Sequence, residues 1–396
     1  MILPDAPWRH RPGLDRLLDL LGAGSGETRF VGGSVRDTLL AVDVSDIDLA
    51  TRLAPEEVMR RLEAGAIRAI PTGLAHGTVT AVLAGRPVEV TTLRRDVATD
   101  GRRATIAYTG DWREDAARRD FTINALSADP TSGEIFDYFG GLDDLEARRV
   151  RFIGDPLTRI AEDHLRILRF FRFHARFGRG DPDAAGLAAC TARANDLMAL
   201  SRERIADELL KLLGLADPAP TVALMIAHGI LKPVLPEIAE ADRLVALIES
   251  ERAARIAPAA IRRLAALLPP DPQVAASVAA RLRLSKVQTR RLVSAASADL
   301  DSPELLAYEI GSAEAIDRLL LQGRTDPFVA ALEGWSRPQL PVGGGDLIAM
   351  GLPQGPIVAR TLKSIERAWA RAGFPGEEAA RALAQTEVDQ ALRAMK

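Results

Sequence analysis

The sequence predicts an α+β protein, with a small mixed β-sheet in the first third of the chain and helices in the rest. Before about residue 140, short apolar runs that read as strands are interleaved with brief helical segments. From Pro156 onward, apolar residues recur at helical spacing and strand signals are nearly absent. We therefore expect one mixed region followed by a longer, all-helical region.

The composition is that of an ordinary globular protein. The chain has 396 residues, of which 47% are apolar and 27% charged, and its net charge is −3. Charge alone therefore does not predict a nucleic-acid partner, although a local basic face still binds phosphate because salt screens distant charges. The single cysteine, Cys190, excludes an internal disulfide and a multi-cysteine zinc site. With no membrane-length apolar stretch and no signal peptide, we expect a cytoplasmic protein without a membrane or an obligate protein partner.

Local signals predict the elements of the first third. Pro12 opens a helix that ends near Gly22, and a strand over 28–31 runs into a pair of glycines. The next expected elements are a helix over 35–40 capped by Ser34, a strand over 46–50, a helix over 55–64 and strands over 67–70, 79–83 and 88–93.

The character of the sequence changes after residue 93. Residues 94–119 are charged and carry few apolar side chains, which predicts a long mobile loop. Order resumes at 121–126, and 134–139 and 150–153 predict a final strand pair. In the helical region, Gly- and Pro-containing breaks are expected at 178–183, 214–220, 269–272 and 335–345.

The first functional motif is a glycine turn followed by an acidic pair. Gly33 lies between a strand and a helix, where glycine lets backbone N–H groups approach a phosphate, and Arg36 adds a charged donor. Asp46 and Asp48 are two residues apart on the next expected strand, so both carboxylates project from one face. Glu89, on a neighbouring strand, is a candidate third carboxylate.

This acidic pair predicts a magnesium site. Two close carboxylates repel each other unless a cation lies between them, and Mg²⁺ prefers such oxygen ligands. Two ions about 3.5–4 Å apart would activate an attacking hydroxyl and stabilise a leaving pyrophosphate. The alternative is structural, because a glycine turn, an Asp-x-Asp strand face and a solvent-facing Glu89 each occur without function. Their combination in this order favours function.

The second motif is Arg118-Arg119-Asp120, followed by Phe121 and Ile123 as expected core anchors. The arginines are suited to hold a triphosphate, and the aspartate a ribose hydroxyl. Alone, such a charged run is usually part of a solvated surface.

The third motif is the run from Glu162 to Phe173. On a helix, Asp163, Arg166 and Arg169 share one face, which Arg172 continues. An aspartate accepts from the exocyclic amine of C or A, and an arginine donates to the adjacent ring acceptor, whereas G and U present the opposite order. An Asp/Arg pair would therefore select C and A. The alternative is a helix-surface salt bridge, since Glu162 and Arg166 stand at i,i+4.

Five sequence blocks together resemble the bacterial class II tRNA nucleotidyltransferase and poly(A) polymerase family. The blocks are VGGSVRD, DIDLA, RRDFTINAL, DP with EDHLRILRFFRF, and SRERIADELLKLL, and they extend from about Phe30 to Leu213. The resemblance implies a nucleotidyltransferase head (1–140), a neck with a nucleotide-reading helix (141–215), a helical body (216–334) and a helical, tRNA-binding tail (335–396).

The resemblance also implies roles for individual residues. Asp46 and Asp48 look like the magnesium ligands, and Asp163 and Arg166 like the protein's substitute for a template base. The implied contacts to nucleotide phosphate, ribose or base are Gly33, Arg36, Arg119, Asp120, Arg169 and Arg172. The block that begins at Ser201 and includes Glu203 supports the nucleotide-reading helix in this family.

The function expected from these residues is template-independent addition of C, C and A to the 3′ end of tRNA. CTP and ATP would be the substrates, pyrophosphate the product and Mg²⁺ the cofactor, with no protein base required. Four alternatives remain: poly(A) addition, addition of only CC or only A, an RNA-binding protein with an inactive head, and a nucleotidyltransferase acting on another acceptor. The presence of the 94–119 segment favours the full activity, because it is a candidate for the switch from C to A.

Overall fold

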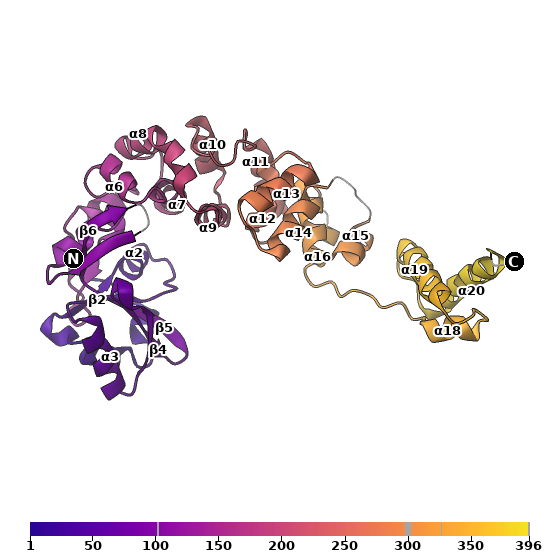
Figure 1. Ribbon diagram of the computed structural model, residues 1–396, viewed down its shortest axis with the longest axis horizontal. Coiled ribbons are helices and arrows are strands. Elements are labelled where there is room, and N and C mark those ends of the chain that lie inside the picture. The colour runs from indigo at the N-terminus through magenta and orange to yellow at the C-terminus, as the bar shows by residue number, and fades with distance from the viewer. Residues whose placement is uncertain (101–102, 298–301, 326, 395–396) are drawn as a thin grey trace. The chain divides into compact units, whose positions relative to one another are not determined.

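The structure is a computed structural model that describes residues 1–100, 103–297, 302–325 and 327–394 (Figure 1). The chain divides into two compact units, Met1–Pro236 and Glu237–Lys396. The first holds the mixed sheet and the second only helices among its described residues, so the predicted α+β class is confirmed. Within the described residues, no helix has the length and apolar character needed to cross a bilayer.

A seven-stranded mixed sheet organises the first unit, in the order β3-β4-β5-β2-β1-β8-β9. Its strands are β1 (Thr28–Val31), β2 (Asp48–Thr51), β3 (Arg68–Gly73), β4 (Thr78–Leu83), β5 (Arg86–Thr92), β8 (Ser127–Ala128) and β9 (Ile135–Phe136). β2 and β5 pair in parallel, whereas the other neighbours are antiparallel. Phe30, Leu49 and Val90 are buried, so one face of the central strands is fixed by the core.

Helices surround the sheet and continue beyond it. The α-helices of the first unit are α1 (Leu14–Leu20), α2 (Gly33–Leu39), α3 (Pro55–Ala64), α4 (Trp112–Ala117), α5 (Gly141–Glu146), α6 (Pro156–Glu162), α7 (Arg166–Phe177), α8 (Ala184–Ala192), α9 (Arg202–Leu213) and α10 (Ala219–Ala227). The 3₁₀ turns are η1 (Pro7–His10), η2 (Ala23–Ser25), η3 (Leu74–His76), η4 (Thr122–Asn124) and η5 (Ala194–Ala199). Phe121 packs on Phe152, which stacks on Phe170 of α7, so this aromatic cluster joins α7 to the end of the mixed region.

The prediction of a long loop over 94–119 is wrong for the residues of this segment that the structure describes. The segment forms a two-stranded sheet, β6 (Arg94–Asp100) with β7 (Arg103–Tyr108), and then α4. A two-stranded ribbon pairs its backbone without burying one whole face, so the apolar alternation that marks a strand is absent. Asp111 caps α4 by accepting from the backbone N–H of Arg113, and Trp112 is the helix's large apolar anchor.

Three smaller expectations are also corrected. Residues 134–139 and 150–153 do not pair with each other, because β9 pairs with β8 and Phe152 forms an isolated bridge with Phe121. The apolar pattern of the sequence indicated which segments are extended but not which strands pair with each other. The glycine-turn helix starts at Gly33 rather than after a Ser34 cap, since Gly32 occupies the cap position. β2 starts at Asp48, so Asp46 precedes the strand.

The second unit is helical throughout its described part. Its helices are α11 (Asp242–Ala254), α12 (Ala260–Leu267), α13 (Pro272–Arg281), α14 (Lys286–Ala295), α15 (Pro303–Ile310), α16 (Ser312–Leu321), α17 (Pro327–Ala331), α18 (Gly344–Ala349), α19 (Pro356–Arg371) and α20 (Glu377–Ala394). The four predicted breaks lie at junctions between consecutive helices, although those at 214–220, 269–272 and 335–345 extend into the first residues of α10, α13 and α18. The division into head, neck, body and tail stays a prediction.

Candidate active site

A cavity of about 440 Å³ in the first unit collects most of the residues singled out from the sequence. Its lining residues are Gly32, Gly33, Arg36, Asp48, Arg119, Asp120, Asn124, Asp163, Arg166, Arg169 and Phe173. They come from β2, α2 with the glycine before it, the segment after α4 with the turn η4, the residue after α6, and α7. Of the predicted site residues, Asp46, Glu89 and Arg172 do not line it.

The glycine turn lets an arginine approach the backbone. Gly32 has φ 66° and ψ −121°, a conformation that side-chain-bearing residues rarely adopt. A Cβ added there would lie 2.8 Å from Nη1 of Arg119. Glycine is therefore required both for the turn and for the position of Arg119 against it.

The acidic edge of the cavity is Asp48. This residue starts β2, and Glu89 lies opposite it in register on the parallel neighbour β5. Burial, together with the nearby carboxylates of Glu89 and Asp46, raises the pKa of Asp48 to about 6, although Arg119 opposes the shift. Asp46 itself is exposed and accepts from Ser45 Oγ at 2.7 Å. Negative charge is therefore concentrated around one half-buried carboxyl group.

No complete metal-ligand set is assembled in the described part of the chain, counting groups of three or more His, Cys, Asp and Glu. The expectation that Asp46 and Asp48 share one strand face is not met, because Asp46 lies before β2 begins. The parallel register nevertheless brings Glu89 beside Asp48, as expected for a carboxylate on a neighbouring strand.

A continuous polar network lies along the floor of the cavity. Arg36 is buried and donates to Asp37 at 2.7 Å and to the side-chain oxygen of Asn124. Asn124 in turn donates to Asp120 at 2.9 Å, and Asp120 accepts from Nε of Arg169 at 2.7 Å. Burial alone would raise the pKa of Asp120, but Arg169 and Asn124 keep that pKa below its ordinary value. Both oxygens of Asp120 are thus already engaged.

Asp163 is not on the same helix as Arg166. It occupies an extended break, with φ −152° and ψ 106°, between α6 and α7. Its carboxylate accepts from the backbone N–H of Leu165 at 3.1 Å and from Nη2 of Arg204, at 3.1 Å to one oxygen and 2.8 Å to the other. The prediction of one helical face is therefore wrong at its first residue, although both side chains still line the same cavity.

Arg166 and Arg172, both on α7, each donate to an acidic side chain. Arg166 donates to Glu162, which realises the salt bridge considered above, and to the carbonyl oxygens of Arg159 and Arg118 at 2.8 and 3.2 Å. Arg172 donates to Glu208 of α9 at 2.5 Å. Arg172 therefore links α7 to α9 and does not line the cavity.

Sequence reasoning missed four residues of this region, namely Asn124, Phe173, Arg204 and Glu208. Phe173 lies within 5.3 Å of the guanidinium carbons of Arg36, Arg169 and Arg172, measured to the ring centroid. All four belong to the sequence blocks described above, but residues of these types are common on helix surfaces and in cores, so nothing in the sequence marked them as site residues. Only the tertiary contacts show which site residues they bind.

The arrangement suits recognition of a nucleotide. An acidic edge, two arginines beside a glycine turn, and a neighbouring acceptor–donor pair share one cavity. The first two elements fit a metal-bound triphosphate, and the third fits one edge of a base.

Comparisons with known proteins agree with this chemistry. A family model described as "Poly A polymerase head domain" matches residues 28–151, and one described as "Probable RNA and SrmB- binding site of polymerase A" matches residues 183–242. The chain is 34% identical over 385 residues to the mouse protein named CCA tRNA nucleotidyltransferase 1, mitochondrial, a match that covers 92% of this chain and 88% of the relative. The chain belongs to the CCA tRNA nucleotidyltransferase family.

Further members of this family and their structures support the assignment. The human protein of the same name is 33% identical over 388 residues, covering 92% of this chain and 88% of the relative. A crystal structure of the Bacillus stearothermophilus CCA-adding enzyme in complex with CTP superposes with a TM-score of 0.74 at 25% identity, covering 96% of this chain and 99% of that one. A Thermotoga maritima CCA-adding enzyme complexed with tRNA shares the fold, with a TM-score of 0.66 at 19% identity, covering 100% of both chains.

Proposed function

We propose that this protein adds C, C and A to the 3′ end of tRNA from CTP and ATP and releases pyrophosphate. The observation that carries the proposal is the single cavity that Asp48 shares with Asp163 and Arg166. The names of its relatives support the same activity, and one similar structure is described as a complex with CTP.

We propose that Asp48 and Asp46 hold Mg²⁺, with Glu89, which lies opposite Asp48 on β5, as a candidate third carboxylate. Their donors are all carboxylate oxygens, which suit this ion, and a bound cation would stabilise the charged form of Asp48, whose pKa is raised first by burial and then by the nearby Glu89 and Asp46. When bound, the metal lowers the pKa of the attacking 3′-hydroxyl and stabilises the leaving pyrophosphate. The chain's own contribution is to bring the two strands β2 and β5 together in parallel register, so that Glu89 lies opposite Asp48.

For base selection, we propose that Asp163 accepts from the amine of C or A while Arg166 donates to the ring nitrogen beside it. In this conformation Arg204 orients the Asp163 carboxylate, and Glu162 holds Arg166. G and U would place a donor against Arg166 and an acceptor against Asp163, and such mismatches are costly when water is excluded.

For triphosphate binding, we propose Arg36 and Arg119 beside the glycine turn at Gly33. Both are cationic and line the cavity, and Arg119 is only loosely held, by two contacts of 3.4 Å. Asp120 would serve mainly to position Arg169, because a ribose hydroxyl would have to displace Asn124 or Arg169 from it. Arg169 supplies further positive charge at the cavity, whereas Arg172 pairs with Glu208 outside it.

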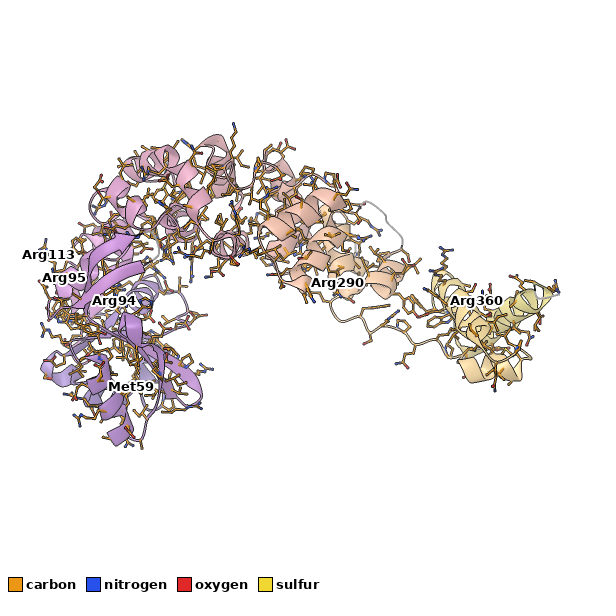
Figure 2. The ribbon with its side chains drawn as sticks, viewed as in Figure 1. Met59, Arg94, Arg95, Arg113, Arg290 and Arg360 are labelled. Carbon is orange, nitrogen blue, oxygen red and sulfur yellow. The ribbon has the colours of Figure 1, made fainter. Side chains whose placement is uncertain are left out.

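The described C-terminal helices carry a feature suited to RNA. Arg360, Lys363, Arg367 and Arg371 are exposed on α19, and their spacing places them on one face of that helix (Figure 2 labels Arg360). None of these four forms an ion pair within the described residues. We propose that this basic stripe contacts tRNA phosphates, in line with a tRNA-binding tail after residue 335. The expected cytoplasmic location stays a prediction, as two of the relatives are named mitochondrial.

The test uses tRNA transcripts that end before, within and after the CCA sequence, each incubated with CTP, ATP and Mg²⁺. We expect completion to CCA and then a stop. Run-on A tails would indicate poly(A) addition, and a halt after CC with ATP present would indicate a partial activity. Binding of tRNA without incorporation would point to an inactive transferase head. Efficient transfer to a protein or small molecule in place of tRNA would indicate another acceptor.

A further inference from the structure

A second basic surface lies on the first unit, away from the nucleotide cavity. We call it the stacked-arginine surface, and its members are Arg29 of β1, Arg52 just after β2 and Arg113 of α4. Each guanidinium lies over an aromatic ring: Arg29 over Phe136 at 3.5 Å and Trp112 at 4.3 Å, Arg52 over Trp112 at 5.6 Å, and Arg113 over Phe139 at 5.7 Å. Figure 2 labels Arg113 at the periphery of this unit.

These arginines differ in their partners from those of the cavity. Within the described residues none of the three forms an ion pair, in contrast to Arg36, Arg119, Arg166 and Arg169 of the cavity. Two of them donate hydrogen bonds to neutral oxygens, Arg29 to the hydroxyl of Tyr138 at 3.2 Å and Arg52 to the carbonyl of Gly110 at 2.9 Å. Stacking fixes the planes of the guanidinium groups without neutralising them, which pre-organises their free N–H groups for an anion. On a chain of net charge −3, such a local excess of positive charge is distinctive.

A second observation points to a missing acceptor. Trp112 is 6% exposed, and its Nε1 has no hydrogen-bond partner in the described part of the chain. The same holds for Nε of Arg29, whose guanidinium lies against that ring. Leaving a buried donor unpaired costs about 1–3 kcal/mol, so two adjacent ones indicate that an oxygen-bearing ligand or water meets them.

The surface is related to the catalytic carboxylate by strand geometry. Side chains alternate along β2, so Asp48, Ala50 and Arg52 project from the same face, and Arg29 lies directly across from Ala50. The backbone N–H of Arg52 continues the pairing by donating to Glu27. Four residues of strand correspond to about 13 Å, so the surface begins a short distance from Asp48.

From this geometry we propose that Arg29, Arg52 and Arg113 bind the phosphate backbone of the RNA whose 3′ end reaches Asp48. The inference rests on the proposed function, which makes RNA the acceptor. The contact is to phosphates and is independent of base sequence, because guanidinium groups held on ring faces offer charge and N–H donors but no pocket for a base. Its effect is to anchor the acceptor strand while the nucleotide cavity exchanges CTP for ATP.

The test is a double variant, Arg52→Gln with Arg113→Gln, since both side chains are exposed and their neutralisation leaves the core intact. The matched control is Arg60→Gln with Arg68→Gln, which removes the same charge from two other exposed arginines of this unit. The affinity for tRNA is measured between 50 and 200 mM KCl. We expect roughly tenfold weaker binding and a slope of log K against log [KCl] that is shallower by about 1.4–1.8, corresponding to two lost phosphate contacts.

Two further readouts separate this inference from the proposed function. The KM for CTP should be unchanged, and kcat at saturating tRNA should be close to that of the unmodified protein. If the unmodified protein shows no incorporation but the double variant still loses RNA affinity and salt slope, the surface is supported and the proposed function fails. Equal affinity and slope in the double variant and the control pair would overturn the surface, whatever the activity.

Discussion

Replacing Asp163 by alanine tests how the cavity chooses a base. The carboxylate is 29% exposed and is the acceptor beside Arg166 at the cavity wall. For CTP, the substitution removes one charge-assisted hydrogen bond to the amine, and for UTP it removes a repulsion between two acceptors. Together the two effects are worth about 1–3 kcal/mol of discrimination in a site that excludes water, so the ratio of kcat/KM for CTP over UTP should fall by about 5- to 150-fold.

The affinity for the triphosphate should change less than the selectivity. The phosphate contacts proposed for Arg36 and Arg119 come from α2 and the end of α4, which the substitution does not touch. Loss of the Arg204 pair is a secondary effect, because both partners are partly solvated. The control is Asp207→Ala, which removes an exposed acid from the neighbouring helix α9.

The assay measures single-nucleotide incorporation into a tRNA transcript that lacks CCA, with each of the four triphosphates in turn. A variant that keeps the CTP-over-UTP ratio of the unmodified protein would refute the assignment of Asp163 to base reading. So would a variant in which all four triphosphates weaken equally, because that result would mean that the residue only maintains the fold of the cavity.

Four further outcomes follow from the structure. Asp48→Asn, or removal of divalent metal with EDTA, should reduce incorporation by several orders of magnitude while the dissociation constant for tRNA changes little. Arg204→Met should lower the CTP-over-UTP ratio by a smaller factor than Asp163→Ala, with tRNA affinity unchanged, because Asp163 keeps its charge but loses its orientation. Glu251→Gln should lower the free energy of unfolding in urea by about 3–5 kcal/mol, because this 2% exposed carboxylate holds two buried arginines. Cys190 should resist thiol reagents in the native protein and react in urea, because burial raises the pKa of its thiol far above the ordinary value.

The sequence predicted the fold best where side-chain pattern and backbone structure coincide. The alternation around Leu49 and the helical spacing after Pro156 both arise from burial, so they located β2 and the helices. The hairpin formed by β6 and β7 was missed because it shows no such apolar alternation. Strand partners were missed for another reason: the bridge between Phe121 and Phe152 joins segments whose pairing is set by tertiary packing.

In the candidate site, too, the sequence predicted some residues and missed others. Residues that offer charge to a ligand, such as Asp48 and Arg119, were recognisable because their types and spacing carry chemistry. Residues that position such charged side chains were not recognisable from the sequence. Asn124 accepts from Arg36, 88 positions away in the chain, and Glu208 from Arg172, 36 positions away. The break at Asp163 was hidden for a local reason: the sequence on both sides has helical spacing, and only the backbone angles show that the chain leaves the helix there.

That break has a structural purpose that a continuous helix would not serve. Within a helix, a carboxylate at position 163 would lie beside the side chains one turn away and compete with Glu162 for Arg166. In the extended conformation it turns instead toward Arg204 of α9, while Glu162 keeps Arg166. The acceptor and the donor are thereby held by separate partners and remain distinct, as recognition of two different atoms of one base requires. The same helix α9 also holds Arg172 through Glu208, so it fixes the segment on both sides of Arg166 without lining the cavity itself.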